Sequence, residues 1–577
     1  MSISRGYSIL LLIFITLGVY YPSIFSGANT IDDPQTLTAY FNANHFDLKA
    51  LFLPASSGYY YRPLLGLTFY FDSFVWGMSE SFLHLENILF HTLNVILVYL
   101  ISGRLSARYS NHDNTVPLCA ALLFAIHPIN TESVNWISGR TDLIACIFLL
   151  LSLYFLLIGS KNNNVSATIT ASIMFLLSCF AKEVAVCALP GLLFLVLYFE
   201  QHGTLIERLH KRWLNLIFLS SSVLIYFLFR FMAFSRGDSG LQLASDSVKL
   251  PASNFYDSVR IILKVFGFYT KKLFFPWPLN FAIVKVSDFY VIVGVLLTIF
   301  LLYIFYNRSV ISGLFLTSIC VLSPALLVAF GKMTWTPLAE RYLYIPAATF
   351  CIAITLLYYI HFIKNKAAIR TLLTFSVVLI FLFSTYTTVN RNITWQSNVA
   401  LFKDALKHAP DFFLAQNALA TALGQEGRHG EAKTLLLSMV APEGNKRGEK
   451  LVDSNRARIL AAEGDLEGAK ELLSRNINDS GVLYAELAEQ LIRIDISLLN
   501  SESDNIKRRN LRQEIVNLML KLQEKSGDSL YYYRIGQFYL INKDNKNAKH
   551  FFHMAYSTSK DGAYYKEAAK KLSDKLR

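Results

Sequence analysis

Long apolar segments without charged side chains constrain the fold of this chain more than any other feature. The first, Tyr7–Phe25, spans 19 residues and contains no Asp, Glu, Lys or Arg. A helix of about 20 apolar residues is long enough to cross the hydrocarbon core of a bilayer. Because no small-residue cleavage site follows, the segment is predicted to be a retained first span rather than a signal peptide.

Further apolar segments recur along the first two thirds of the chain, and with the first they predict about eleven membrane spans. The later ones are Phe82–Ser102, Val116–Ile126, Leu143–Gly159, Ala167–Ala181, Val184–Glu200, Leu214–Phe234, Phe289–Tyr306, Val310–Phe330, Tyr342–His361 and Thr371–Thr388. The third span is short for a bilayer. Since 53% of all residues are hydrophobic, the sequence indicates an all-α polytopic membrane protein rather than a soluble one.

A change in charge density predicts a second domain after Thr388. Residues 389–577 carry 53 charged side chains, against 42 in residues 1–388. Within this region the tripeptides EAK, GAK and NAK place Ala432, Ala469 and Ala548 in steps of 37 and 79 residues. One such step is close to the roughly 34 residues of a tetratricopeptide repeat, and the second is close to two steps. We therefore expect a transmembrane domain over 1–388 and a tetratricopeptide-repeat α-solenoid over 389–577. Its concave surface would suit peptide binding; a plain helical cap is the alternative.

The segment from Asn254 to Phe281 is apolar but carries four cations, and we expect it to lie in the membrane interface. Arg260, Lys264, Lys271 and Lys272 largely share one helical face. The Pro-Trp-Pro sequence at 276–278 is predicted to end this helix. With eleven spans the two ends of the protein lie on opposite sides of the membrane, and the denser Lys and Arg content of one set of loops favours an inside N-terminus.

Polar motifs are predicted to gather on the outer side of the membrane or in the outer ends of the spans. They are Asp32 and Asp33, Arg62, His127 with Glu132, Arg140 with Asp142, Lys182 with Glu183, and Glu340 with Arg341. Each has a structural alternative, such as a solvated turn before Pro34, a helix-capping pair or an interhelical ion pair. Convergence of both charge signs favours a site for a lipid-linked phosphate, with cations for the leaving group and carboxylates for a general base.

Net charge and cysteine content restrict the partners. The formal charge of +13 suits anionic lipid head groups or lipid phosphates. No nucleic-acid partner is expected, because no basic run is interleaved with base-stacking aromatic residues. All six cysteines lie in apolar stretches, so they predict neither a disulfide framework nor a metal site.

Several motifs, taken together and in order, resemble the transmembrane and tetratricopeptide-repeat O-mannosyltransferases and their bacterial relatives. They include TIDDPQTL, YYYRPLLGLTFYFD, HLENILFHTLNVILVYL, LLFAIHPINTESVNWISGRTDLIACIFLLLSLYF, CFAKEVAV, YTKKLFFPWPLNF, TPLAERYLYIPAATF and NRNITWQSNVALFKDALKHAPD. The resemblance implies a GT-C glycosyltransferase that takes a sugar from a polyprenyl or dolichyl phosphate on the outer or luminal face. It implies Asp32 and Asp33 as the catalytic acids, with Asp32 favoured by analogy as the base. Pro34 departs from the commonest pattern of this loop.

The remaining expectations combine the residues and the resemblance. Arg62, Arg140, Lys182 and Arg341 are candidates for binding phosphate, while His91, His127, Glu132, Asp142, Glu183 and Glu340 are expected to shape the pocket. No metal-binding triad occurs; a divalent cation bridging Asp32 and Asp33 is the alternative to arginine and lysine for holding the phosphate.

The expected reaction is inverting transfer of a hexose from a polyprenyl phosphate. The resemblance implies that the hexose is mannose and that the acceptors are Ser or Thr hydroxyls of an exported protein, held by the repeat domain. The alternatives are a GT-C enzyme that glycosylates a lipid or surface polysaccharide, a transporter, and a membrane-anchored repeat scaffold. Compact loops and the modest repeat array favour a bacterial inner membrane with a periplasmic site over the endoplasmic reticulum with a luminal site.

Overall fold

The structure is a computed structural model, and it describes most of the chain. The described residues are 4–34, 36–37, 48–53, 60–108, 114–162, 164–199, 203–234, 255–329, 336–360, 367–439, 446–477, 484–559, 563 and 565–576. The predicted bounds at Glu200, Asn254, Phe330 and His361 lie outside them. Two compact units make up the chain, Met1–Phe412 and Phe413–Arg577. Within the described residues both units are built from helices, with one isolated β-bridge between Ile283 and Leu338. The all-α prediction is confirmed.

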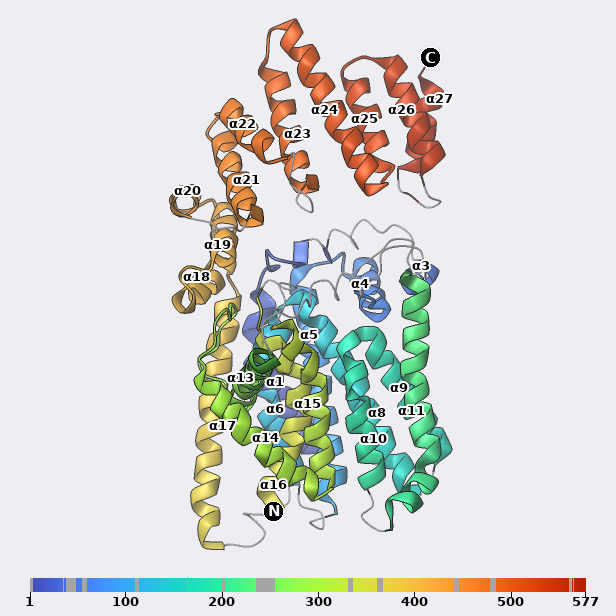
Figure 1. Cartoon of the computed structure of the whole chain (residues 1–577), viewed down its shortest axis with the longest axis vertical. Coiled ribbons are helices and arrows are strands. Elements are labelled where there is room, and N and C mark those ends of the chain that lie inside the picture. The colour runs from blue at the N-terminus through green and yellow to red at the C-terminus, as the bar shows by residue number, and fades with distance from the viewer. Residues whose placement is uncertain are drawn as a thin grey trace. The chain divides into compact units, whose positions relative to one another are not determined.

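The helices of the first unit run side by side as a bundle (Figure 1). The longer ones are α1 (Arg5–Tyr20), α4 (Pro63–Val75), α5 (Glu80–Ser106), α6 (Thr115–Ala125), α8 (Arg140–Asn162), α9 (Val165–Ala181), α10 (Leu189–Tyr198), α11 (Leu205–Phe234), α13 (Phe255–Phe274), α14 (Phe289–Tyr306), α15 (Val310–Val328), α16 (Tyr344–Tyr358), α17 (Ala367–Trp395) and α18 (Asn398–His408). Short helical pieces connect them: η1 (Tyr21–Phe25), α3 (Leu48–Phe52), η2 (Pro128–Asn130), α7 (Thr131–Asn135), η3 (Ile137–Gly139), η4 (Glu183–Ala188) and η5 (Glu340–Leu343).

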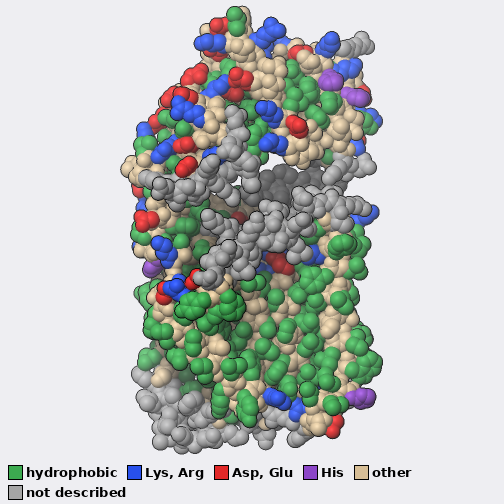
Figure 2. All heavy atoms as spheres, in the orientation of Figure 1, with side chains coloured by type: hydrophobic (Ala, Val, Ile, Leu, Met, Phe, Trp, Pro, Cys, Tyr) green, Lys and Arg blue, Asp and Glu red, His purple; other side chains and the backbone are tan. Residues whose placement is uncertain are grey.

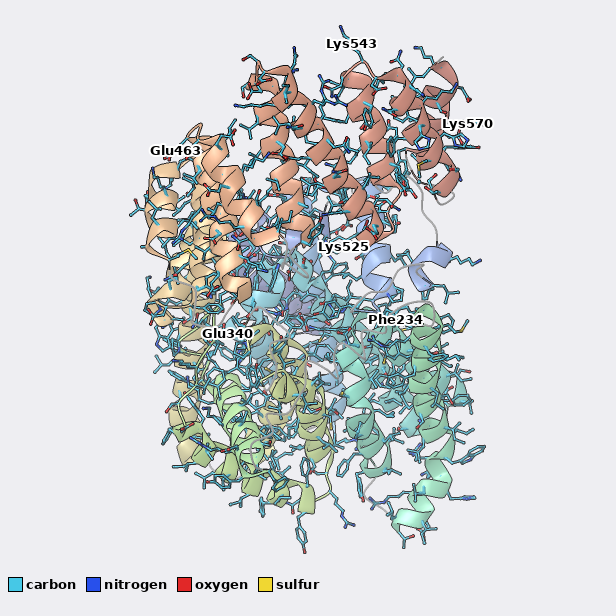
Figure 3. The ribbon with its side chains drawn as sticks, turned by 45° about the horizontal axis from the view of Figure 1, so that its top comes forward. Phe234, Glu340, Glu463, Lys525, Lys543 and Lys570 are labelled. Atoms are coloured by element: carbon cyan, nitrogen blue, oxygen red, sulfur yellow. The ribbon has the colours of Figure 1, made fainter. Side chains whose placement is uncertain are left out.

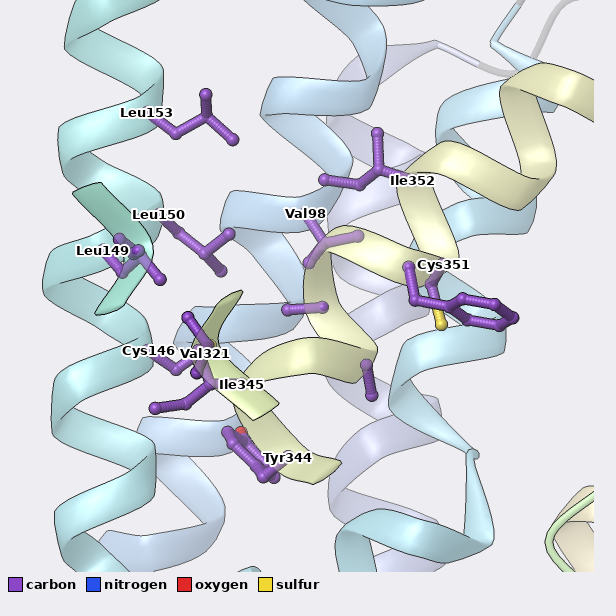
Figure 4. Close-up of a cluster of buried hydrophobic side chains, with 14 of the residues drawn as sticks. Val98, Cys146, Leu149, Leu150, Leu153, Val321, Tyr344, Ile345, Cys351 and Ile352 are labelled. Carbon is purple, nitrogen blue, oxygen red and sulfur yellow. The ribbon is translucent and has the colours of Figure 1, made fainter. Parts of the chain in front are cut away.

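Apolar side chains fill the bundle and also cover its outside. Figure 4 shows part of the core, where Val98 of α5, Leu150 of α8, Val321 of α15 and Ile345 of α16 are buried together. On the surface of this unit, Figure 2 shows a broad zone of hydrophobic side chains. A water-soluble protein would not leave so large an apolar surface exposed, whereas hydrocarbon solvates it. The chain is an integral membrane protein.

Each of the eleven predicted spans contains a helix in the structure. Seven stretches of the described chain are long and apolar enough to cross a membrane: Arg5–Phe25, Glu80–Ser106, Ile137–Ser160, Leu205–Phe234, Phe289–Tyr306, Val310–Val328 and Glu340–Tyr358. The helices Thr115–Ala125, Val165–Ala181 and Glu183–Tyr198 are shorter but equally apolar. The polytopic architecture is therefore confirmed, and the exact number of spans stays a prediction.

The predicted amphipathic segment forms α13, which ends at Phe274, two residues before Pro276. It packs tightly against α14 through Gly267 and Gly294. A Cβ atom on Gly267 would lie 2.2 Å from the carbonyl oxygen of Tyr290, and one on Gly294 would lie 2.1 Å from that of Leu263. Only glycine permits this approach of the two backbones.

The second unit is a series of helices in which each contacts the next along the chain. They are α19 (Phe413–Gln425), α20 (His429–Ser438), α21 (Lys446–Ala462), α22 (Leu466–Ile477), α23 (Tyr484–Ser501), α24 (Asn505–Ser526), α25 (Leu530–Ile541), α26 (Asn545–Thr558) and α27 (Lys566–Lys575). Ala432, Ala469 and Ala548 are buried at the same position of the second helix in three helix pairs. One further pair, α23 and α24, accounts for the double step between the last two alanines.

Candidate active site

The loop after the first membrane helix separates the two adjacent acids. The carboxylate of the buried Asp33 accepts hydrogen bonds from the backbone N–H of Asn29 at 2.8 Å, from the backbone N–H of Ser138 at 3.0 Å and from the Ser138 hydroxyl at 2.5 Å. Burial raises the pKa of Asp33 to about 6, although these hydrogen bonds oppose the shift. Asp33 thereby fastens the first loop to η3, and its lone pairs are largely used.

Asp32 has the opposite environment. Its side chain is exposed, and its backbone carbonyl accepts a hydrogen bond from the backbone N–H of Thr36 at 3.3 Å. Among the described residues, no hydrogen bond to its carboxylate occurs. Partial desolvation raises the pKa of Asp32, while the positive charges of Arg341 and Arg62 lower it. Among the described residues, Asp32 is therefore the acid of the pair whose carboxylate accepts no hydrogen bond, and the charges of two arginines act on it.

Arg341 lies in η5, the short helical turn directly before α16. Its side chain forms an ion pair with Glu132 of α7. One carboxylate oxygen of Glu132 accepts from the guanidinium Nη1 at 2.6 Å, and the other accepts from the backbone N–H groups of Glu340 and Arg341 at 2.9 and 3.1 Å. The guanidinium also lies 4.8 Å from the centre of the Trp136 ring. The Arg341 side chain keeps 18% of its surface exposed.

Arg62 precedes α4 and is held in the same manner by Glu183. The two form a bidentate ion pair, with Nε and Nη2 donating to the two carboxylate oxygens at 2.8 and 2.5 Å. The guanidinium stacks on the Tyr60 ring at 4.1 Å, and its side chain is again 18% exposed. Within the described part of the chain, each arginine is thus oriented by one carboxylate and keeps N–H groups without an acceptor, and the charges of both act on Asp32.

Arg140 is fully buried, and four of its five N–H donors are bonded within the described residues. Its guanidinium pairs with Asp72 and with Glu86 at 2.9 Å, and it also donates to the Asn87 side chain at 3.1 Å and the Leu83 carbonyl at 3.3 Å. This cluster ties the start of α8 to α4 and α5. A helix-capping pair of Arg140 and Asp142 was the structural alternative for these two residues; in the structure Asp142 instead binds Lys182.

Two further buried ion pairs fix neighbouring helix ends. Lys182, after α9, donates to both carboxylate oxygens of Asp142 at 2.6 and 2.7 Å. Lys272 of α13 donates to Glu340 at 2.7 Å and to the carbonyls of Pro276 and Pro278. Figure 3 labels Glu340, which lies directly before Arg341. Lys272 therefore supports the segment that carries Arg341.

The histidines of the predicted site serve the packing of helix ends. Nδ1 of His91 lies 2.7 Å from the Tyr344 hydroxyl, and Nε2 lies 3.2 Å from the Ala125 carbonyl. His127 accepts from the Ile129 N–H at 3.3 Å and donates to the Leu273 carbonyl at 3.0 Å. Burial lowers the pKa of His127 to about 4, so its imidazole is neutral at pH 7. Neither ring has a free nitrogen for a substrate.

The described residues contain no group of three or more His, Cys, Asp and Glu side chains close enough to hold a metal ion. Around Asp33 the neighbours are N–H and O–H donors, which occupy the oxygens that a cation would need. A divalent cation bridging Asp32 and Asp33 stays a prediction.

Asp72, Glu86 and Lys272 are the site-supporting residues that the sequence prediction missed. All three stand within the motifs quoted above, in FYFD, HLEN and YTKKLF. A charged residue inside an apolar segment needs a partner when it is buried, and this was the signal that could have found the two acids.

Several curated proteins are similar to this chain. No family model matches the chain. The chain is 25% identical to Protein O-mannosyl-transferase TMTC3 of Mus musculus over 484 residues, which cover 76% of this chain and 51% of that protein. It is 27% identical to Protein O-mannosyl-transferase TMTC4 of Homo sapiens over 405 residues, 61% of this chain and 53% of that protein. Its curated homologues are protein O-mannosyl-transferases of the TMTC family.

The similarity to the TMTC family extends across most of the chain at low identity. Protein O-mannosyl-transferase F38B6.6 of Caenorhabditis elegans is 23% identical over 387 residues, 65% of this chain and 52% of that protein. The chain spans about half the length of the curated relatives it matches. The predicted resemblance to this family is confirmed.

Proposed function

We propose that this protein is an inverting glycosyltransferase that moves mannose from a polyprenyl or dolichyl phosphate to Ser or Thr hydroxyls of an exported protein. The observation that carries the proposal is the exposed carboxylate of Asp32 under the charges of Arg341 and Arg62. The names of the homologues support mannosyl transfer to protein. The apolar bundle supports a donor that resides in the membrane.

Asp32 would act as the general base. It takes the proton of the acceptor hydroxyl while the hydroxyl oxygen attacks C1 of the mannose from the face opposite the phosphate. The bond between C1 and the phosphate oxygen breaks, and the phosphate leaves with the electron pair. One displacement of this kind inverts the anomeric centre.

Arg341 and Arg62 would stabilise the phosphate as it gains charge. Their bonds to Glu132 and Glu183 orient both guanidinium groups before the donor arrives, and preorganised donors of this kind stabilise a transition state efficiently. The fully buried Arg140 and the paired Lys182 instead hold the helix ends in place. Asp33 positions the loop from which Asp32 projects.

The second unit, Phe413–Arg577, is called the repeat unit below, and it would hold the acceptor polypeptide. Polar side chains on the first helices of successive pairs are bonded to one another: Asn455 of α21 donates to Asn417 of α19, Ser454 donates to Gln490 of α23 at 2.9 Å, and Arg534 of α25 donates to Glu489 at 2.5 Å. They form one row across four helices. Ser454 and Asn455 are buried, and the partly exposed Asn417, Glu489, Gln490 and Arg534 would offer hydrogen-bonding groups to an extended peptide.

The test is transfer by the purified full-length protein from a mannosyl polyprenyl phosphate to a Ser- and Thr-containing peptide, read by mass spectrometry of the peptide. Asp32→Asn should lower turnover about 100- to 10,000-fold, because an amide cannot accept the proton. Asp411→Asn, at an exposed acid near the end of the first unit, should leave turnover unchanged. Wild-type turnover in folded Asp32→Asn protein would refute the assignment.

We further propose a bacterial inner membrane location with the site and the repeat unit in the periplasm. The same reaction on the luminal face of the endoplasmic reticulum is the alternative.

A further inference from the structure

A cluster of exposed charges joins α13 to the beginning of α14. Asp288 binds both Arg260 and, at 2.8 Å, Lys264. The side chains remain exposed, by 44% for Arg260, 26% for Lys264 and 55% for Asp288. Two cations share one carboxylate, so the cluster has a net positive charge. An exposed ion pair contributes little to stability, which leaves the cluster without a structural reason for its position.

Exposed aromatic side chains stand at both ends of the same helix. Phe255 and Tyr256 begin α13 with 86% and 74% of their surfaces exposed. At the other end, Phe274 is the last residue of the helix and Phe275 and Trp277 follow it, and these three are 51–52% exposed. Exposed aromatic residues beside Lys and Arg are typical of the head-group layer of a membrane. The surroundings of the cluster therefore match a lipid surface better than open water.

We propose that Arg260 and Lys264 bind the phosphate of an anionic phospholipid head group, and that α13 transmits this binding to the segment that carries Arg341. Lipid binding does not depend on the reaction; its effect on turnover rests on the proposed function.

The opposite face of α13 provides the transmission. Tyr269, Lys272 and Leu273 lie about 120° to 220° around the helix from Arg260 at 100° per residue. The Tyr269 hydroxyl accepts from the Ala339 N–H at 3.2 Å, Lys272 binds Glu340 at 2.7 Å, and the Leu273 carbonyl accepts from His127 at 3.0 Å. Two of these contacts fall on the two residues directly before Arg341.

The packing of α13 makes the connection stiff. Gly267 and Gly294 bring the backbones of α13 and α14 into direct contact, which leaves little room for one helix to shift against the other. A head group that pulls on Arg260 and Lys264 acts on this pair, and through Lys272 and Tyr269 on the loop before Arg341.

The first experiment measures lipid binding by native mass spectrometry of the full-length protein exchanged into detergent with equal amounts of phosphatidylglycerol and phosphatidylcholine. Wild-type protein should retain phosphatidylglycerol preferentially. The Arg260→Gln/Lys264→Gln variant should retain it about tenfold less, since each cation near an anionic surface contributes appreciably. Asp288→Asn should retain more, because it removes the competing carboxylate. Millimolar inorganic phosphate should not displace the lipid.

The matched control is Arg308→Gln, an exposed cation beyond the other end of α14. It should retain phosphatidylglycerol as wild type does. Equal retention of the two lipids by wild-type protein, or equal loss in the Arg308→Gln and double variants, would overturn the lipid site.

The second experiment measures mannosyl transfer in vesicles of phosphatidylcholine with and without 30% phosphatidylglycerol. Wild-type turnover should rise severalfold with the anionic lipid, and turnover of the double variant should not respond. Loss of the response with binding intact would overturn the transmission alone. Absence of any transfer in wild type would refute the proposed function and leave the binding result standing.

Discussion

Two adjacent aspartates in the first loop occupy environments that differ almost completely. Asp33 is buried and accepts three hydrogen bonds, whereas Asp32 is exposed and faces two arginines. Three hydrogen bonds occupy most of the lone-pair sites of the buried Asp33 carboxylate, which makes it less accessible than Asp32 to an incoming hydroxyl. The pair therefore divides into one acid that shapes the loop and one that is available for chemistry.

The charges around Asp32 predict how the reaction depends on pH. Asp32 must be ionised to act as a base, and the cations of Arg341 and Arg62 lower its pKa. Removing a cation raises that pKa, so Arg62→Gln should shift the acid limb of kcat/KM towards higher pH. Profiles of kcat/KM against pH for wild type, Arg62→Gln and Arg104→Gln would test this, the last being paired with Tyr154 away from the site. Superimposable acid limbs for all three would contradict the role of Asp32.

Lys272 predicts a large effect on stability. Its ammonium and the Glu340 carboxylate are both buried, with 3% and 2% of their surfaces exposed. Lys272→Met leaves a buried carboxylate without its partner, which typically costs about 3–5 kcal/mol. Thermal unfolding in detergent should show a clearly lowered midpoint, and the double variant with Glu340→Gln should recover part of the loss. An unchanged midpoint would mean that the ion pair is not formed.

The sequence motifs identified many of the residues at the candidate site, but they did not predict what each of these residues does. The motifs located Asp32, Arg62 and Arg341, but they also nominated Arg140, which the structure buries among two acids and two oxygen acceptors. The sequence prediction placed Lys272 largely on one face with Arg260 and Lys264. At 100° per residue Lys272 lies about 120° from Arg260, and in the structure it is buried against Glu340. Which face of an amphipathic helix meets the site depends on tertiary packing, and sequence spacing does not contain that information.

The elements themselves followed from local patterns. Apolar stretches gave the membrane helices, and the recurring alanines gave the register of the repeat unit, because a small residue is needed where two helices cross. The turn before each alanine shows why the repeat was hard to recognise. Gly427 and Gly464 adopt positive φ angles of 76° and 91°, and Lys543 adopts 61° at the equivalent place. Two repeats keep the glycine that this turn favours, and the third has lost it.

This difference predicts a stabilising substitution in α25–α26. The left-handed conformation destabilises the folded state by about 1–2 kcal/mol when the residue has a Cβ. Glycine avoids this cost, but it loses more conformational entropy on folding, which offsets part of the gain. Lys543→Gly should therefore stabilise the protein by about 0.5–1 kcal/mol. Lys546→Gly, inside the following helix, should destabilise it by about as much. The midpoints of thermal unfolding of the two variants and wild type would test this prediction. Equal shifts of both midpoints in the same direction would contradict the turn argument.

At the scale of the whole molecule, the paired charges collect where membrane helices end. Arg62, Lys182 and Arg341 bind acids from other helices, so each ion pair closes a contact between distant parts of the chain. Partners separated by 40 to 209 residues could not be matched from the sequence, because both signs recur at several helix ends and any pairing satisfies the charge count. The sequence therefore predicted that charged residues gather at the helix ends, but it did not predict which residues pair with each other.

The proposed reaction requires that Asp32 and the repeat unit share one side of the membrane. If α13 lies in the interface, the remaining spans leave the site and the repeat unit outside. If α13 spans, Arg260 and Lys264 must enter hydrocarbon at about 2.5–3.5 kcal/mol each near its centre. Single cysteines at Asp32 and Ser503, both exposed, should therefore react with a membrane-impermeant maleimide from outside in a cysteine-free background. A cysteine at the exposed Asn307, beyond the other end of α14, should react only after permeabilisation. Protection of Ser503 together with labelling of Asp32 would put the acceptor-holding unit on the wrong side of the membrane, and transfer to a protein held there would be impossible.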